Sequence, residues 1–269
     1  MKSNKKSSEG LKGAFSSSVI PVAFIASVLV YLFVFGDGSN FVGGSNKNVP
    51  LPNNFFGIIY KGGPIVPIII TLLLTVLAFA VERYMAISKA AGKGKIVSFM
   101  ADINSMLGNG KIEEAKTACN EQKGSVANVI FCGLGKYQKM EKELALTKDQ
   151  KVVAIQKEIE EATSLELPAL EQNLVILSTI ASVATLMGLL GTVIGMIKAF
   201  SALANAGAPD SVQLAAGISE ALINTAFGIG TSALAIVAYN FFTTKIDKLT
   251  YSIDEAGFTI VNTFAEKNQ

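Results

Sequence analysis

Glu220 is the residue of this sequence best placed to handle a proton, because it stands alone among small and apolar residues. The chain of 269 residues contains no histidine, so proton transfer must use carboxylates, lysines, tyrosines or water. If a helix begins near Ser211, Glu220 lies roughly 13 Å along it, in the outer half of a bilayer. An ionised carboxylate at that depth is costly unless it faces water or a partner, which favours an ion pathway over the structural alternative, a salt bridge or a helix-end position near the surface.

Glu220 lies in one of two apolar stretches whose small and hydroxyl residues share a helix face, at about 100° per residue. Small residues let helices approach closely, and hydroxyls bond neighbouring backbone, so close packing explains the glycines without any further function. Packing does not explain Glu220. The faces include Gly188, Thr192 and Gly195 in the first stretch, and Gly217, Glu220, Asn224, Thr225 and Gly228 in the second.

Lys198 is the other charged residue of these two stretches. It stands near the predicted outer end of its helix, where a long side chain can carry its ammonium group to the membrane surface. The simpler interpretation of Lys198 is therefore a snorkelling side chain.

Four apolar stretches predict transmembrane helices. Half of the residues are hydrophobic and only 16% are charged, which is too apolar for a soluble enzyme of this length. About 20 apolar residues cross a bilayer as a helix, and the last two stretches reach that length without a charge or nearly so. The first, after four lysines, has a cleaved signal peptide as its alternative, but it is longer than such a segment usually is, which favours a retained helix.

The positive charges predict the orientation of these helices. Thirteen of the 23 Lys and Arg residues lie between the second and third stretches, four precede the first and three follow the last. The net charge of +2 gives no reason to expect nucleic acid. The predicted order is a cytoplasmic tail over 1–18, a helix over 19–35, an outside loop over 36–64, a helix over 65–81, a cytoplasmic helical domain over 82–173, a helix over 174–203, an outside loop over 204–211, a helix over 212–242 and a cytoplasmic helix over 243–269.

The cytoplasmic segment is predicted to be helical, which makes the fold class all-α: a polytopic membrane protein with long helices extending into the cytoplasm. Residues 96–107 and 111–121 predict a short hairpin around the turn at Gly108–Gly110. Apolar residues from Val152 to Leu165 recur every three or four positions, as in an amphipathic helix. Since only Pro168 separates this helix from the third span, one continuous helix is expected, kinked before the proline.

Enzyme chemistry is not expected. The sequence contains no phosphate-binding loop and no motif that pairs a nucleophile with a base. Two separated cysteines, Cys119 and Cys132, form neither a metal site nor a disulfide framework and are interpreted as ordinary buried thiols. No catalytic residue, metal or cofactor is therefore predicted.

Two strings carry a family resemblance. Residues 187–196 (MGLLGTVIGM) and 217–228 (GISEALINTAFG) resemble the paired signatures of the ExbB/TolQ/MotA proton-channel family, most closely those of ExbB. The sequence ERY at 82–84 and Tyr239-Asn240 are also similar to that family. An additional first span distinguishes this chain from the three-span members.

The resemblance implies a motor subunit of the bacterial inner membrane, without chemistry of its own. Five such chains would surround a dimer of a single-span ExbD-like partner, in contact with lipid, and proton flow would drive a TonB-like protein for outer-membrane transport. Alternatives are a TolQ-like or MotA-like stator subunit, or a scaffold that only houses a proton-carrying partner. Thr192, Glu220, Thr225 and Asn224 are the expected pathway residues, and Gly188, Gly191, Gly195, Gly217 and Gly228 the expected packing residues.

Overall fold

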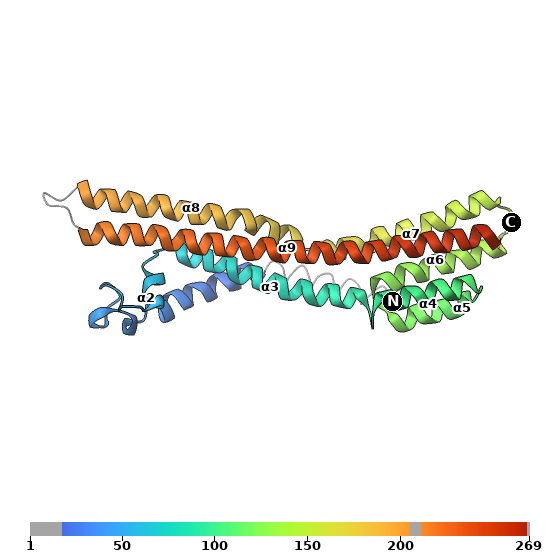
Figure 1. Cartoon of the computed structure of the whole chain (residues 1–269), viewed down its shortest axis with the longest axis horizontal. Coiled ribbons are helices and arrows are strands. Elements are labelled where there is room, and N and C mark those ends of the chain that lie inside the picture. The colour runs from blue at the N-terminus through green and yellow to red at the C-terminus, as the bar shows by residue number, and fades with distance from the viewer. Residues whose placement is uncertain (1–17, 205–210, 268–269) are drawn as a thin grey trace. The chain divides into compact units, whose positions relative to one another are not determined.

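The computed structural model describes residues 18–204 and 211–267. Within these ranges the chain is mainly helical and has no strands, which confirms the predicted all-α class. The predicted N-terminal tail and most of the loop over 204–211 lie outside the described residues. The chain divides into two compact units, one of residues 1–81 and 175–239 and one of 82–174 and 240–269. Four helices of the described residues are long and apolar enough to cross a membrane (Figure 1).

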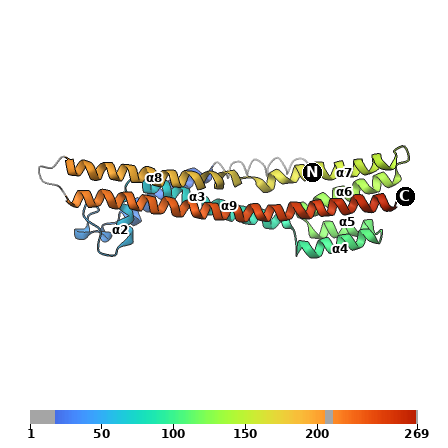
Figure 2. The same cartoon turned by 45° about the horizontal axis from the view of Figure 1, so that its top comes forward.

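The first unit contains the four candidate spans. They belong to an N-terminal helix (Ser18–Phe35), α3 (Ile65–Ala91), α8 (Leu174–Ala204) and α9 (Ser211–Lys267). The N-terminal helix ends in a π-helical turn, η1 (Val30–Phe35). In this unit α8 and α9 run side by side in both views (Figures 1 and 2).

The N-terminal helix packs on α3 through a buried hydroxyl. Ser27 lies 2.8 Å from both the Thr71 hydroxyl and the Pro67 carbonyl oxygen. Ser27 is fully buried, and Thr71 is nearly so. A polar contact of this kind fixes two apolar helices against each other at one register, because the two hydroxyls and the Pro67 carbonyl oxygen meet only at that register.

The segment between these helices is built by asparagine side chains around short turns. It contains η2 (Gly38–Asn40), η3 (Val42–Gly44) and α2 (Phe55–Tyr60). Asn54 caps α2 by accepting from the Gly57 amide, and its own amide donates to Asn40 at 3.0 Å. The sequence predicts an irregular loop here; its polar side chains replace the missing secondary-structure hydrogen bonds.

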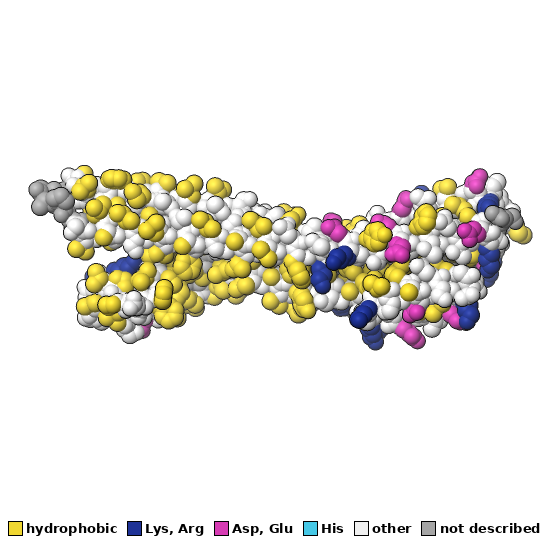
Figure 3. Space-filling view, in the orientation of Figure 1, with side chains coloured by type: hydrophobic (Ala, Val, Ile, Leu, Met, Phe, Trp, Pro, Cys, Tyr) yellow, Lys and Arg dark blue, Asp and Glu magenta, His cyan; other side chains and the backbone are white. Residues whose placement is uncertain are grey.

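The second unit is a bundle of α4 (Ile96–Gly108), α5 (Ile112–Gln122), α6 (Gly124–Lys142), α7 (Lys148–Glu171) and the C-terminal part of α9. The predicted hairpin is α4 and α5. Its core contains Tyr137 of α6 edge-on to Phe264 of α9, with ring centroids 4.9 Å apart. Charged side chains gather on this unit in Figure 3, whereas the visible face of α8 is apolar.

The prediction of one continuous helix kinked before Pro168 is wrong. Pro168 lies inside α7, and the helix ends three residues later, at Glu171. Asn173 then takes a left-handed conformation with φ of 67°, and α8 begins at Leu174. The break lies after the proline because the buried guanidinium of Arg83 donates to the Ala169 and Leu170 carbonyl oxygens, which a helix end leaves without amide donors.

Candidate functional site

The small faces of α8 and α9 meet at backbone contact. A Cβ atom added to Gly195 would lie 2.7 Å from the Gly217 carbonyl oxygen, and one added to Gly228 would lie 2.6 Å from the Gly188 Cα. A Cβ at Gly191 would lie 2.8 Å from Nδ2 of Asn224. Each of these positions therefore excludes a larger residue, as the sequence predicts for close helix packing.

Thr192 of α8 and Thr225 of α9 meet at this seam, where their hydroxyls hydrogen-bond to each other. Thr192 also reaches the Gly188 carbonyl oxygen at 3.2 Å, and Thr225 the Ala221 carbonyl oxygen at 3.1 Å. The two hydroxyls thus have two protons for three possible hydrogen bonds, so only two of these bonds form at any one time. The pair can exchange its donor and acceptor roles without moving a heavy atom.

Glu220 forms an ion pair with Lys198 across the same seam. The Lys198 Nζ lies 2.6 Å from Oε1 of Glu220, whose side chain is only 10% exposed. Lys198 is half exposed, so one end of the pair reaches the surface of the chain. The interpretation of Lys198 as a snorkelling side chain therefore missed its partner, which is 22 residues away and adjacent only through the pairing of α8 with α9.

Asn224 is fully buried one turn further along α9. Its Nδ2 donates to the Gly62 carbonyl oxygen at 2.8 Å, and its Oδ1 has no hydrogen-bond partner among the described residues. The next residue, Gly63, has φ of 76°, and a Cβ added there would lie 2.5 Å from Oε1 of Glu220. The Gly62–Gly63 turn before α3 is therefore part of the site, although the sequence marks it only as an interruption of an apolar stretch.

The structure thus brings the four predicted pathway residues into one region of the first unit, together with Lys198 and the Gly62–Gly63 turn. Their role in proton movement stays a prediction. Among the described residues, no group of three or more Cys, Asp or Glu side chains is placed to hold a metal ion. What the cluster offers is a carboxylate paired with an ammonium group, an amide with a spare acceptor, and two exchangeable hydroxyls.

The two thiols lie in the second unit and differ in their surroundings. Cys119 is buried, and this burial raises its pKa to about 12. Cys132 is half-buried; its pKa is raised by burial and by the negative charges of Glu158 and Glu166. Both thiols are therefore neutral at physiological pH, and neither is an activated nucleophile.

Comparison with known proteins supports the family resemblance. Residues 134–255 match the MotA/TolQ/ExbB proton channel family. The chain is similar to the Tol-Pal system protein TolQ of Pseudomonas aeruginosa, at 26% identity over 66% of this chain and 79% of that protein. It is 39% identical to the TolQ of Haemophilus influenzae over 33% of this chain and 39% of that protein.

A biopolymer transport protein, ExbB of Pseudomonas putida, is also similar, at 34% identity over 32% of this chain and 26% of that protein. The matches to this ExbB and to the Haemophilus influenzae TolQ thus span well under half of the relatives' own lengths. Relatives of both names match, so the similarity supports the family without separating ExbB from TolQ.

Proposed function

We propose that this chain, whose residues 134–255 match the MotA/TolQ/ExbB proton channel family, is an ExbB-like subunit of a motor driven by the proton-motive force. The family belongs to the inner membrane and is not an enzyme family. In the proposed complex five copies surround a dimer of a single-span, ExbD-like partner, which carries the titrating carboxyl. A TonB-like protein receives the work and opens outer-membrane transporters.

The observation that carries this proposal is the meeting of Glu220, Lys198, Thr192 and Thr225 at one seam of two apolar helices. A partner carboxyl that moves between ionised and protonated states needs hydrogen-bond donors in one state and acceptors in the other. The threonine pair supplies both, because its protons can change places among three bonds. A membrane potential of 100 mV supplies about 2.3 kcal/mol per charge moved, so low barriers along the path are required.

The experiment reconstitutes the chain with its partner in vesicles and measures proton flux and assembly separately. Thr192→Val keeps the shape of the side chain and removes its hydroxyl, and we expect flux to fall while the complex still assembles. Thr179→Val is the matched control, since Thr179 is an exposed residue of the same helix whose hydroxyl donates to the Val175 carbonyl oxygen one turn earlier. Full flux in Thr192→Val combined with Glu220→Gln, at normal assembly, would overturn the polar-pathway proposal.

A second candidate is a scaffold that only houses a proton-carrying partner. The backbone contacts of Gly188, Gly195, Gly217 and Gly228 favour it, since they serve packing alone. The scaffold predicts that threonine substitutions weaken assembly and flux in proportion. The channel subunit predicts that assembly survives while flux falls, so the same vesicles separate the two functions.

The orientation and the extra span belong to the same proposal: both termini and residues 82–173 are cytoplasmic, and the N-terminal helix is retained. The buried contacts of Ser27 with Thr71 and Pro67 support retention, because they join the N-terminal helix to α3. Edman sequencing of the purified chain tests retention directly. Membrane-impermeant thiol labelling of single cysteines at Lys47 and Lys245 tests the orientation.

A further inference from the structure

The turn at Gly62–Gly63 contacts two buried polar side chains of α9, Asn224 and Glu220. The Gly62 carbonyl oxygen receives the Asn224 amide, and Gly63 leaves just enough room for the Glu220 carboxylate. Both contacts depend on glycine: a Cβ at Gly62 would lie 2.9 Å from Ile223, and one at Gly63 would meet Glu220. The positive φ of Gly63 is also a conformation that side-chain-bearing residues avoid.

Tyr60, two residues before the turn, contacts three residues between positions 31 and 46. Its ring stacks on Tyr31 with centroids 4.7 Å apart, and its carbonyl oxygen accepts from the Tyr31 hydroxyl at 3.0 Å. Phe41 packs edge-on to the same ring, and Asn46 donates to the Tyr60 hydroxyl. The Tyr60 carbonyl oxygen also accepts from the Gly63 amide. The contacts that position Tyr60 therefore also position the turn.

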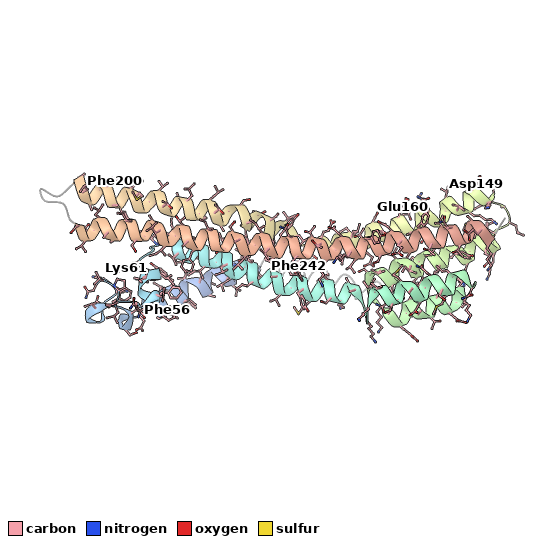
Figure 4. The ribbon with its side chains drawn as sticks, viewed as in Figure 1. Phe56, Lys61, Asp149, Glu160, Phe200 and Phe242 are labelled. Carbon is pink, nitrogen blue, oxygen red and sulfur yellow. The ribbon has the colours of Figure 1, made fainter. Side chains whose placement is uncertain are left out.

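The next residue is held as well. The Lys61 ammonium donates to the carbonyl oxygens of Asn46 and Lys47, at 2.9 and 3.2 Å. Figure 4 labels Lys61 and Phe56 at this end of the first unit. Beneath the turn, Val66 and Ile70 of α3 and Ile223 of α9 form a buried cluster. Tyr31 and Phe35 of the N-terminal region also pack against that cluster, so one apolar contact surface joins three helices.

We propose that residues 18–61 act as an outer clamp, which fixes the Gly62–Gly63 turn against Glu220 and Asn224 and so sets the position of the Glu220 carboxylate in the proton pathway. Gly63 and Tyr31 are its positioning residues. The inference rests on the proposed function, in that Glu220 takes part in proton movement. It adds that the extra span is a working part of the site and not only a membrane anchor.

The turn influences Glu220 because groups from two different segments contact the same carboxylate oxygen. Lys198 binds Oε1 from α8, and the Gly63 backbone lies against the same oxygen from the start of α3. Displacing a reacting group by about 1 Å can cost up to about a hundredfold in rate. A turn that shifts with the clamp therefore changes flux without any change to Glu220 itself.

The test compares two glycines of like conformation in the reconstituted complex. Gly63→Ala places a methyl group on the Glu220 carboxylate, and we expect proton flux to fall by about tenfold or more. Gly94→Ala is the matched control, because Gly94 lies outside residues 18–61 and has φ of 82°, so the backbone strain is similar, but a Cβ there would come no closer than 4.0 Å to the Gln122 side chain. Equal losses in the two variants would overturn the proposal, because strain alone would then explain Gly63.

A rescue separates positioning from general damage. Asp is one methylene shorter than Glu, so Gly63→Ala combined with Glu220→Asp restores room for the carboxylate. We expect more flux from the double variant than from Gly63→Ala alone. Losses that multiply would contradict the clamp, since independent sites do not rescue each other.

If Gly63→Ala does not accumulate in membranes, Tyr31→Phe decides. It keeps the ring stack and removes the hydroxyl bond to Tyr60, and we expect a loss of a few fold, against no loss in Tyr251→Phe, whose side chain is exposed. Flux in Tyr31→Phe equal to that in Tyr251→Phe overturns the clamp. Full flux in Glu220→Gln would instead overturn the proposed function, so the two failures are distinguishable.

Discussion

Two ion pairs of this chain, Arg83 with Glu82 in the second unit and Lys198 with Glu220 in the first, differ in how completely their groups are bonded. Arg83 is 2% exposed, and its guanidinium donates to both carboxylate oxygens of Glu82 and to two backbone carbonyl oxygens. Glu220 has one ion-pair partner among the described residues, and that partner is half exposed. A fully bonded group holds a structure, whereas a partly bonded group can change its partner, which is what a pathway needs.

The largest expected effect is on folding, from Arg83→Met. The change removes the Arg83 donors from two carbonyl oxygens and from the Glu82 carboxylate, which keeps the Asn173 amide, and breaking a buried pair from one side costs about 3–5 kcal/mol. We expect thermal unfolding in detergent, followed by circular dichroism, to occur at much lower temperature. Arg83→Lys keeps the charge but not the forked geometry, so its unfolding temperature should lie between those of Arg83→Met and the unchanged chain. An unchanged unfolding temperature would remove the distinction between the two pairs.

Glu220→Gln should differ from Arg83→Met in that it causes a large loss of proton flux and little loss of stability. Glutamine keeps the size and the hydrogen-bonding oxygen, and a pair with a half-exposed partner contributes about 0–1 kcal/mol. We expect partner-dependent proton flux to fall by about a hundredfold while the unfolding temperature changes by a few degrees at most. A variant that unfolds as readily as Arg83→Met would show that Glu220 is structural.

Lys198→Met should have an intermediate effect that sharpens the comparison. It removes the cation from Glu220 while the long apolar stem still packs, since methionine fills similar space. Flux should fall severalfold, whereas Lys136→Met, which breaks a pair with Glu158 in the second unit, should leave flux unchanged. Equal flux in both variants would mean that Lys198 only snorkels.

The smallest expected effect concerns the interior of the second unit. Because its pKa is raised to about 12, Cys119 favours folding fully below pH 9, and this contribution is lost as the pH rises towards 12. At pH 8 we expect maleimide to label Cys132 well before Cys119 in the folded chain. Equal labelling rates would show that the core around Cys119 opens as readily as the surroundings of Cys132.

The sequence predicts what depends on composition and period, and it fails where two distant segments meet. Four spans, the hairpin of α4 and α5, and the small faces follow from apolar runs and from spacing along one helix. The pairing of Lys198 with Glu220 depends on the register of α8 against α9, and the bond from Asn224 to Gly62 joins residues 162 positions apart. No local pattern carries that information.

The break at Asn173 is a second instructive failure. Proline predicts a kink at its own position, because it lacks an amide and crowds the preceding turn. The helix continues past Pro168 because Arg83, 86 residues away from Ala169, supplies donors to the carbonyls beyond it. Only the three-dimensional partner decides where such a helix ends.

That break has a consequence for how the sequence can vary in length. An α-helix turns by about 100° per residue, so one inserted residue in a continuous helix rotates everything that follows. Because Gln172 and Asn173 interrupt the helix, an insertion in α7 need not turn Thr192 away from Thr225. No such interruption exists in α9, where Glu220 and Phe264 share one helix of 57 residues. Length polymorphism should therefore be tolerated in α7 and selected against between Glu220 and Phe264.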